Sequence, residues 1–290
     1  MDRLAVPLPI APAPRVRFRE LRSLWIQVTG TLCNLACTHC LNASGPRAPW
    51  LASLDGDTVR RALADAEAHA VKEIYFTGGE PLLHPELPEF LATALTIGPT
   101  TVLTNGTLID EALAERLAAL ATASIYSLEI RVSLDGASST ENDAVRGAGT
   151  FARAMSGIRA LGAHGLLPIV TATDVRHDPT LATRLRATLL GAGLTRPRIK
   201  ILPLLPAGRA ARRHTVPLLT ADELDGFDEH RLMCTETRVV AAGGVYACPI
   251  LAGLSGARLG PTLTASFGST PLYHQACRTC WETGLACTNA

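Results

Sequence analysis

Six short runs of β-branched and aliphatic residues recur along the first 202 residues of this chain, separated by longer stretches rich in alanine and leucine. Strand–helix alternation at this spacing favours parallel strands joined by right-handed helical crossovers. An α/β fold follows, either a doubly wound sheet or a (β/α) barrel, and six units correspond to a partial (β/α)6 TIM-like barrel. The predicted strands cover residues 24–28, 73–76, 101–103, 128–134, 167–172 and 198–202.

Helices are expected in the stretches between and after these strands. In the first stretch, Val59, Ala62, Leu63, Ala66 and Ala70 follow the 3.6-residue period of an amphipathic helix. The same periodicity predicts helices over residues 57–70, 88–96, 109–121, 151–164 and 179–190.

The pattern changes after the sixth strand. It weakens into Pro206-Ala207-Gly208-Arg209 and a basic Arg212-Arg213-His214, which we interpret as a solvated linker rather than as a contact for an anionic substrate. The residues beyond it are too poor in apolar side chains to fold well without a staple such as a metal cluster. We therefore predict an N-terminal extension (1–21), a barrel (22–215) and a small cysteine-rich domain (216–290).

Composition excludes several classes of protein. Of the 290 residues 47% are hydrophobic and 18% charged, with a formal net charge of +1, which is typical of a compact globular protein and gives no indication of a nucleic-acid partner. The proline-broken N-terminus and the lack of an apolar run of about 18 residues argue against a signal peptide and a membrane span. We expect a cytoplasmic protein with no membrane partner.

Eight cysteines fall into two groups at the two ends of the chain. Cytosolic cysteines seldom form disulfides, so clustered thiols there indicate metal binding or reactivity. The uneven distribution predicts two separate sites. Cys33, Cys37 and Cys40 form the first group, and Cys234, Cys248, Cys277, Cys280 and Cys287 form the second.

The first group is spaced Cys33-x3-Cys37-x2-Cys40 and directly follows the first predicted strand. A [4Fe-4S] cube held by three thiolates keeps one iron open, whereas the bacterial ferredoxin run supplies more cysteines and closes its sites. An open iron is able to bind a substrate or cofactor. The alternative is a zinc site with His39 as fourth ligand, which the adjacency of His39 and Cys40 disfavours.

With this spacing and position the chain resembles the radical S-adenosylmethionine (SAM) enzymes. The resemblance implies that the open iron chelates the amino and carboxylate groups of SAM, and that one electron cleaves SAM to a 5'-deoxyadenosyl radical that abstracts a substrate hydrogen. The protein then binds and orients the reacting groups and excludes water from them. An external reductant such as ferredoxin or flavodoxin is implied as a partner.

Residues after the second strand resemble another family segment. Gly78-Gly79-Glu80-Pro81 matches the family's GGEP sequence. The resemblance implies that the glycines let the backbone approach SAM closely and that Glu80, with nearby carbonyls, accepts hydrogen bonds from the methionine ammonium. Without the cysteines the segment is an ordinary loop.

Two further segments follow the third and fourth strands. Thr104-Asn105-Gly106 resembles the family's TNG segment near the ribose or methionine end of SAM, and Ser133 and Arg146 resemble the pair that holds the SAM carboxylate. Each motif comes just after a predicted strand. Such loops gather at the carboxyl-terminal mouth of a parallel barrel, where active sites lie.

The second cysteine group resembles the auxiliary-cluster region of the Twitch and SPASM subfamilies. The resemblance implies one auxiliary [4Fe-4S] cluster in a Twitch-like domain. Cys287 is then a spare thiol or displaces one of the four ligands, and a structural zinc site is the alternative. The four implied ligands are Cys234, Cys248, Cys277 and Cys280.

The expected activity is radical abstraction of hydrogen from a small polar metabolite, with oxidation or rearrangement, because only 23 residues precede the first strand. Modification of a ribosomal peptide by thioether formation, carbon–carbon crosslinking or epimerisation is the alternative, and a non-catalytic iron–sulfur or zinc protein is a third hypothesis. No catalytic residue follows from spacing alone. The candidates are Asp135, Arg146, Glu236 and Cys287.

Overall fold

The six predicted strands form the centre of one sheet. The computed structural model describes residues 13–47 and 49–284. Within them the six strands are parallel and lie side by side in chain order, which confirms the partial (β/α)6 barrel. Their bounds are β2 (Ser23–Gln27), β3 (Glu73–Thr77), β4 (Thr100–Thr104), β5 (Leu128–Ser133), β6 (Ile169–Asp174) and β7 (Arg198–Pro203).

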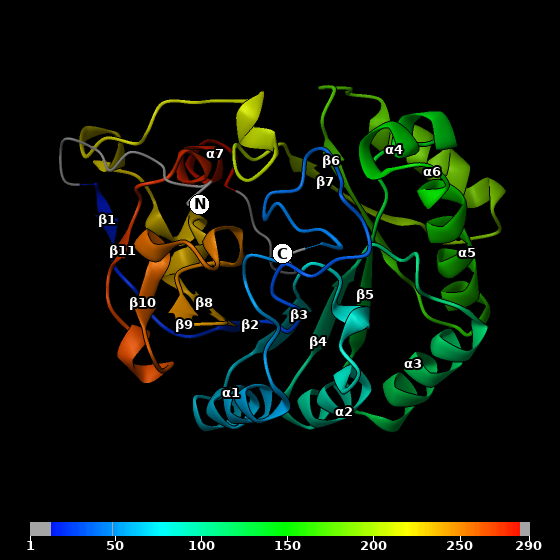
Figure 1. The fold of residues 1–290 in the computed structure, drawn as a ribbon, viewed down its shortest axis with the longest axis horizontal. Helices are drawn as coiled ribbons and strands as arrows, with labels where there is room; N and C mark the ends of the chain where they lie inside the picture. The colour runs from blue at the N-terminus through cyan, green and yellow to red at the C-terminus, as the bar shows by residue number, and fades with distance from the viewer. Residues whose placement is uncertain (1–12, 48, 285–290) are drawn as a thin grey trace.

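The helices that follow the barrel strands form an arc outside them (Figure 1), and α7 lies apart with the C-terminal segments. The first begins where the Asp55 side chain accepts a hydrogen bond from the Thr58 amide at 2.7 Å, as an N-cap does. Its buried face carries Val59, Leu63 and Ala66 against the sheet. The helices are α1 (Gly56–Ala68), α2 (Leu87–Ile97), α3 (Glu111–Ala123), α4 (Ser139–Arg146), α5 (Thr150–Ala163), α6 (Leu181–Gly191) and α7 (Gln275–Thr283).

The C-terminal residues extend the barrel sheet. Strand β8 runs parallel to β2 on the edge opposite β3, and Ser23 Oγ and Thr237 Oγ1 lie 2.6 Å apart across this junction. The sheet order is therefore β10-β9-β8-β2-β3-β4-β5-β6-β7. The added strands are β8 (Thr237–Ala241), β9 (Gly244–Tyr246) and β10 (Arg258–Gly260), and a separate pair joins β1 (Arg15–Val16) to β11 (Thr270–Pro271).

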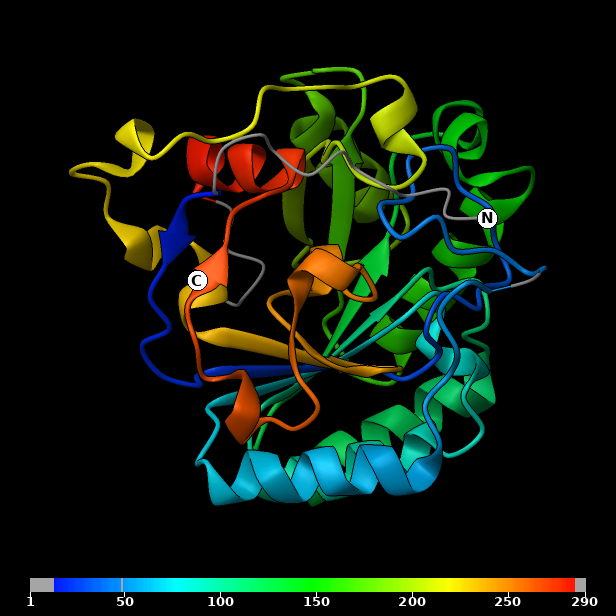
Figure 2. The same ribbon diagram turned by 60° about the vertical axis from the view of Figure 1, so that its left-hand side comes forward.

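Two hydrophobic cores lie on the two faces of this sheet. The larger one packs β2–β6 against helices α1, α2, α3, α5 and α6. The second joins Trp25 and Tyr75, whose rings stack 4.3 Å apart, to the C-terminal segments. Figure 2 shows α7, in red, on the side of the strands away from α1. The C-terminal part is thus held by packing against the barrel, in addition to any metal it binds.

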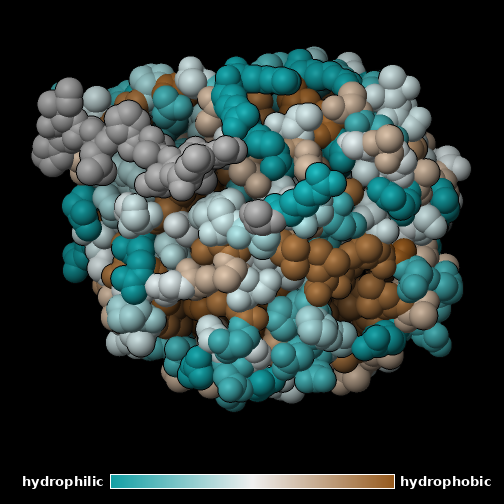
Figure 3. Space-filling view, viewed as in Figure 1, coloured by the Kyte–Doolittle hydropathy of each residue, from teal (hydrophilic) through white to brown (hydrophobic). Residues whose placement is uncertain are grey.

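Surface features add two observations. The face drawn in Figure 3 is mostly polar, with an apolar area right of centre over β4 and β5. None of the helices in the described residues combines the length and apolar character needed to cross a bilayer.

Candidate functional site

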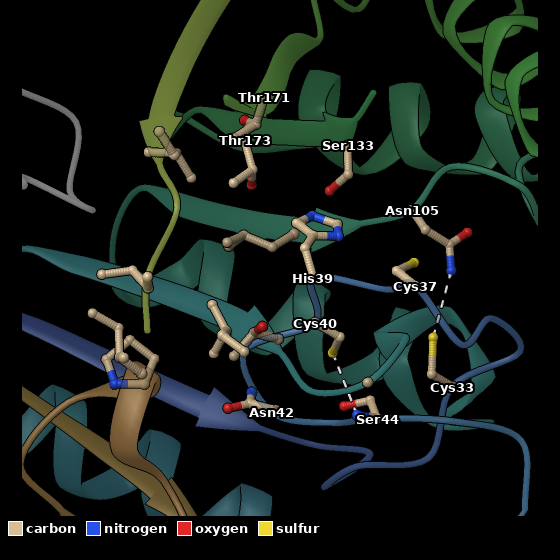
Figure 4. A pocket seen from close by; sticks show the side chains of 18 of the residues that line it. Cys33, Cys37, His39, Cys40, Asn42, Ser44, Asn105, Ser133, Thr171 and Thr173 are labelled. Carbon is tan, nitrogen blue, oxygen red and sulfur yellow. Dashed lines mark hydrogen bonds between the residues drawn. The ribbon is translucent and has the colours of Figure 1, made fainter. Parts of the chain in front are cut away.

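One pocket of about 250 Å³ lies at the carboxyl ends of the parallel strands. Side chains from the loops after β2, β3, β4 and β5 line it, and β6, β7 and the C-terminal Pro249 and Ile250 complete the wall. Figure 4 shows three sulfur atoms and Asn105 at one side of this space and the hydroxyls of Ser133, Thr171 and Thr173 above it. The predicted convergence of the motifs on one mouth is therefore present.

The cysteine loop presents three buried or partly buried sulfurs to this pocket. Cys33 Sγ accepts a hydrogen bond from the Leu35 amide at 3.4 Å, and Cys40 Sγ accepts one from the Ser44 amide at 3.3 Å. Burial raises the pKa of Cys33 to about 12 and also raises that of Cys37. The thiols of Cys33 and Cys37 are therefore protonated unless a metal binds, and metal binding releases their protons.

The Gly78-Gly79 turn packs directly against the cysteine loop. A Cβ on Gly79 would lie 2.1 Å from the carbonyl oxygen of Leu32 and 2.9 Å from the Cβ of Cys33. Gly78 has φ +146°, and a Cβ there would meet Thr29 Oγ1 at 2.2 Å. Glycine is required at both positions because no side chain fits between the two loops.

Glu80 is not among the residues that line the pocket, and the role implied for its carboxylate stays a prediction. The side chain is fully buried, and its oxygens accept hydrogen bonds from Thr104 Oγ1 and the Asn105 amide, both at 2.7 Å, and from the Leu82 amide at 3.2 Å. The carboxylate ties the turn after β3 to the end of β4. Pro81 is buried at the start of a short 3-10 helix and does not line the pocket either.

Thr104 and Asn105 both line the pocket, as expected. The Asn105 side-chain amide donates to Asn34 Oδ1 at 2.8 Å and lies 3.8 Å from Cys33 Sγ (Figure 4). The segment after β4 thus contacts the cysteine loop directly through the Asn105 side chain. Its backbone is also hydrogen-bonded to Glu80.

Arg146 lies at the pocket wall in a buried ion pair. Its Nε is 2.6 Å from Asp135 Oδ2, and His39 Nε2 is 3.0 Å from the same oxygen. The Thr173 amide donates to the other Asp135 oxygen at 2.7 Å. Burial alone would raise the pKa of Asp135, but Arg146 and His39 outweigh it and hold the pKa below its ordinary value.

This environment bears on two of the catalytic candidates. An ionised carboxylate already paired with the Arg146 guanidinium and contacted by His39 is a weak proton acceptor. Asp135 therefore fixes Arg146 and His39, which line the pocket, and does not line it itself. Glu236 lies on the surface beside Arg22 and His230 and is also absent from the pocket wall. Cys287 lies outside the described residues.

Arg209 is a pocket residue that the sequence analysis assigned to a solvated linker. Its side chain instead donates to the carbonyl oxygens of Cys37 at 2.6 Å and Ser44 at 2.7 Å. The interpretation was wrong because the contact joins residues 172 positions apart. The basic run alone carries no signal of such a partner.

The C-terminal cysteines share the second hydrophobic core. Cys234, Cys248, Cys277 and Cys280 are each buried. Burial raises the pKa of Cys234, and the nearby Cys248 and Cys277 raise it further. In the described residues no three metal-ligating side chains converge at the spacing of a single metal ion.

A buried arginine accompanies these thiols. Arg238, fully buried on β8, donates to the carbonyl oxygens of Cys234, Thr237, Ser266 and Gly268 at 2.7–3.0 Å. Burial lowers its pKa to about 10, and Cys234 and Cys248 oppose this shift, so thiolates there would stabilise the guanidinium.

The Radical SAM superfamily model matches residues 28–182. The chain belongs to the radical SAM superfamily. This match spans β3 to β6 and the loops after β2 to β5, which supply most of the pocket lining, and it confirms the family predicted from the cysteine spacing. Membership of this family favours an enzyme of radical chemistry over the non-catalytic hypothesis.

Among sequence relatives, the chain is 32% identical over 263 residues to mycofactocin maturase MftC of Mycobacterium ulcerans, covering 75% of this chain and 65% of the relative. It is 31% identical over 186 residues to Fe-coproporphyrin III synthase of Methanosarcina barkeri, covering 62% and 43%. The chain therefore spans less than two thirds of the length of these relatives.

Solved structures share the fold at low identity. SuiB of Streptococcus suis bound to the precursor peptide SuiA aligns with a TM-score of 0.65 at 15% identity, covering 88% of this chain and 66% of that one. The anSMEcpe structure with AdoMet bound aligns with a TM-score of 0.61 at 18% identity, covering 84% and 80%. Each alignment covers a larger share of this chain than residues 28–182 do. The structural likeness therefore extends into the C-terminal residues.

The pocket fits the cofactors of a radical SAM enzyme. Polar atoms of three pocket residues, His39 Nδ1, Ser44 Oγ and Thr171 Oγ1, are buried without a hydrogen-bond partner in the described structure. Buried polar groups are normally paired, so these atoms indicate a ligand rich in hydrogen-bonding groups. Three thiols on the same wall supply ligands for an iron–sulfur cluster.

Proposed function

We propose that this enzyme modifies a peptide substrate by radical chemistry. The observation that carries the proposal is the 32% identity to a maturase across 75% of this chain. Fold neighbours solved with a precursor peptide or a Kp18Cys peptide bound lend further support. A small polar metabolite, our first expectation, has less support, since the relatives of that kind match shorter parts of the chain.

In this proposal, residues of the barrel mouth would hold SAM. When bound, the cluster and SAM supply a 5'-deoxyadenosyl radical. Cys33, Cys37 and Cys40 would hold the cluster. Arg146, oriented by Asp135, faces the pocket as a donor for a carboxylate, and the Gly78-Gly79 backbone approaches closely enough to contact a ligand.

The substrate side of the pocket is more apolar. The end of β7 and the segment after it contribute Leu202, Pro203, Leu204 and Leu205, and Pro249 and Ile250 face them from the C-terminal part. Figure 4 shows this wall, in olive and orange, across the space from the labelled cysteines. Such a wall excludes water from a reactive radical and suits apolar portions of a peptide.

The C-terminal cysteines complete the proposal with one auxiliary [4Fe-4S] cluster. Cys234, Cys248, Cys277 and Cys280 lie in one buried core, and Arg238 provides a cation beside them. A buried cation requires compensating negative charge, which cluster thiolates supply. Ferredoxin or flavodoxin is the proposed electron donor.

A direct assay tests the peptide proposal. The anaerobically reconstituted enzyme is incubated with SAM, dithionite and a library of synthetic peptides, and peptide masses are compared with and without SAM. A SAM-dependent mass change in a peptide subset supports the proposal. SAM turnover that leaves all peptides unchanged but alters small metabolites of a cell extract contradicts it.

A further inference from the structure

Arg209 binds the cysteine loop at three points. Its backbone amide donates to the carbonyl oxygen of Cys40 at 3.0 Å, and its side chain donates to those of Cys37 and Ser44. These acceptors flank the second and third cysteines of the loop. Two donors of one planar guanidinium reach two separate carbonyls, a geometry that lysine cannot reproduce.

The preceding residue brings Arg209 into place. Gly208 has φ +55°, and a Cβ there would lie 2.3 Å from the carbonyl oxygen of Leu41 and 2.4 Å from that of Cys40. The segment after β7 therefore lies against the cysteine loop in a way that admits only glycine. The contact is close packing of two backbones and does not depend on one long side chain alone.

The same segment belongs to the substrate wall and to the second core. Leu204 and Leu205 line the pocket, and Leu205 and Ala207 pack in the core that contains the C-terminal cysteines. Arg209 thus joins the cysteine loop to a segment that is itself anchored in the C-terminal part.

The charge of Arg209 also faces the loop. No ion pair to a carboxylate is found for it among the described residues, and its guanidinium lies beside Cys37, to whose carbonyl oxygen it donates. A cation held beside cluster thiolates stabilises the more negative, reduced state, because reduction adds negative charge.

We propose that Arg209 is a positioning residue for the radical SAM cluster: its three hydrogen bonds fix the loop that carries Cys37 and Cys40, and its charge raises the reduction potential of the cluster. This role goes beyond the proposed peptide chemistry and does not depend on the substrate. Failure of either proposal leaves the other standing.

The test compares Arg209→Gln, Arg209→Lys and the matched control Arg212→Gln, since Arg212 is an exposed neighbour. In the anaerobically reconstituted proteins with SAM added, hydrogen exchange of the amides of residues 38–45 is measured together with the midpoint potential of the SAM-binding cluster. Loss of two charge-assisted hydrogen bonds predicts exchange at least about tenfold faster in both Arg209 variants.

The two Arg209 variants separate the effect of its side-chain hydrogen bonds from the effect of its charge. The potential is expected to fall in Arg209→Gln and to return toward the wild-type value in Arg209→Lys, which keeps the charge. Arg212→Gln should match wild type in both measurements. Exchange rates and potentials in Arg209→Gln equal to those of Arg212→Gln would overturn the proposal. If Arg209→Gln does not fold, an unchanged exchange rate in Arg209→Lys overturns it.

Discussion

Asp135 is the residue whose substitution should disturb the pocket most without touching a cluster ligand. Its carboxylate is buried between Arg146 and His39. Asp135→Asn leaves the Arg146 charge buried without its partner, which costs about 3–5 kcal/mol of unfolding free energy at pH 7. Urea denaturation measures the loss. Asp57→Asn, at an ion pair whose aspartate is 77% exposed, should cost less than about 1 kcal/mol.

The same substitution alters the acid dependence of stability. The folded-state pKa of Asp135 lies below its ordinary value, so its contribution is present above a pH of about 3.9 and is lost as the pH falls further. The Asp135→Asn protein should lack this part of the loss of stability at low pH. A variant with the same acid profile as wild type would contradict the charge assignment.

Glu80 should show the opposite pH dependence. Burial raises its pKa from 4.5 to about 7 although three donors favour the ionised form. The wild-type protein therefore loses part of its stability as the pH rises from 4.5 to about 7. Glu80→Gln removes this pH dependence. It also lowers the free energy of unfolding by about 1–3 kcal/mol at low pH, because the side-chain NH₂ replaces an oxygen that accepts a hydrogen bond from a buried donor.

Urea midpoints at pH 5 and pH 8 measure this effect. Glu115→Gln, at an exposed position within α3, serves as control and should change stability by less than about 0.5 kcal/mol. Equal pH dependence in the Glu80→Gln and Glu115→Gln proteins would show that Glu80 stays ionised over this range.

The spacing of motifs in the sequence identified residues whose partners are close in sequence or whose side chains have few functional roles. Three thiols at Cys33-x3-Cys37-x2-Cys40 have few alternative uses, and their loop does line the pocket. The roles of Glu80 and Arg209 were not accessible from spacing, because each is decided by a partner distant in sequence, Asn105 for Glu80 and Cys37 for Arg209.

At the scale of elements, Gly208 tests the contact between the segment after β7 and the cysteine loop. Gly208→Ala places a Cβ within 2.4 Å of two loop carbonyls, so the segment must move away from Cys40. We expect reduced iron content after reconstitution and faster loss of iron in air. The left-handed backbone conformation itself costs about 1–2 kcal/mol.

Gly193→Ala controls for that strain. Gly193 has φ +93° with nothing within 4 Å of the added Cβ, so it carries the backbone penalty without the steric one. Its iron content should equal that of wild type. Similar iron content in both variants would mean that the segment does not bear on the cysteine loop.

Strands were predicted better than the short helices. Buried parallel strands are continuous runs of apolar residues, and β2 to β7 lie within about two residues of their expected positions. Helix α4 was missed because its sequence, STENDAVR, is polar. Asp143 within α4 accepts hydrogen bonds from the Gly149 and Phe151 amides at the start of α5, so the side chain joins the two helices. Strand β8 was missed because its partner, β2, lies at the other end of the chain.

At the scale of the whole molecule, the barrel and the C-terminal part share one sheet and one core. A chain ending at residue 215 would expose the edge of β2 and the buried faces of Trp25 and Tyr75. We expect this fragment to bind a hydrophobic dye and to unfold without a sharp transition. Cooperative unfolding at the melting temperature of the full chain would show that the barrel is independent of residues 216–290.

Formation of 5'-deoxyadenosine tests the account most directly. Full-length protein, reconstituted without oxygen, is given SAM and dithionite, beside a variant with Cys33, Cys37 and Cys40 all replaced by alanine. Wild type should form 5'-deoxyadenosine, and the triple variant should form none while retaining about four irons in the auxiliary cluster. Wild type that forms no 5'-deoxyadenosine, or a triple variant that forms it undiminished, would contradict the assignment of the open cluster to these three cysteines.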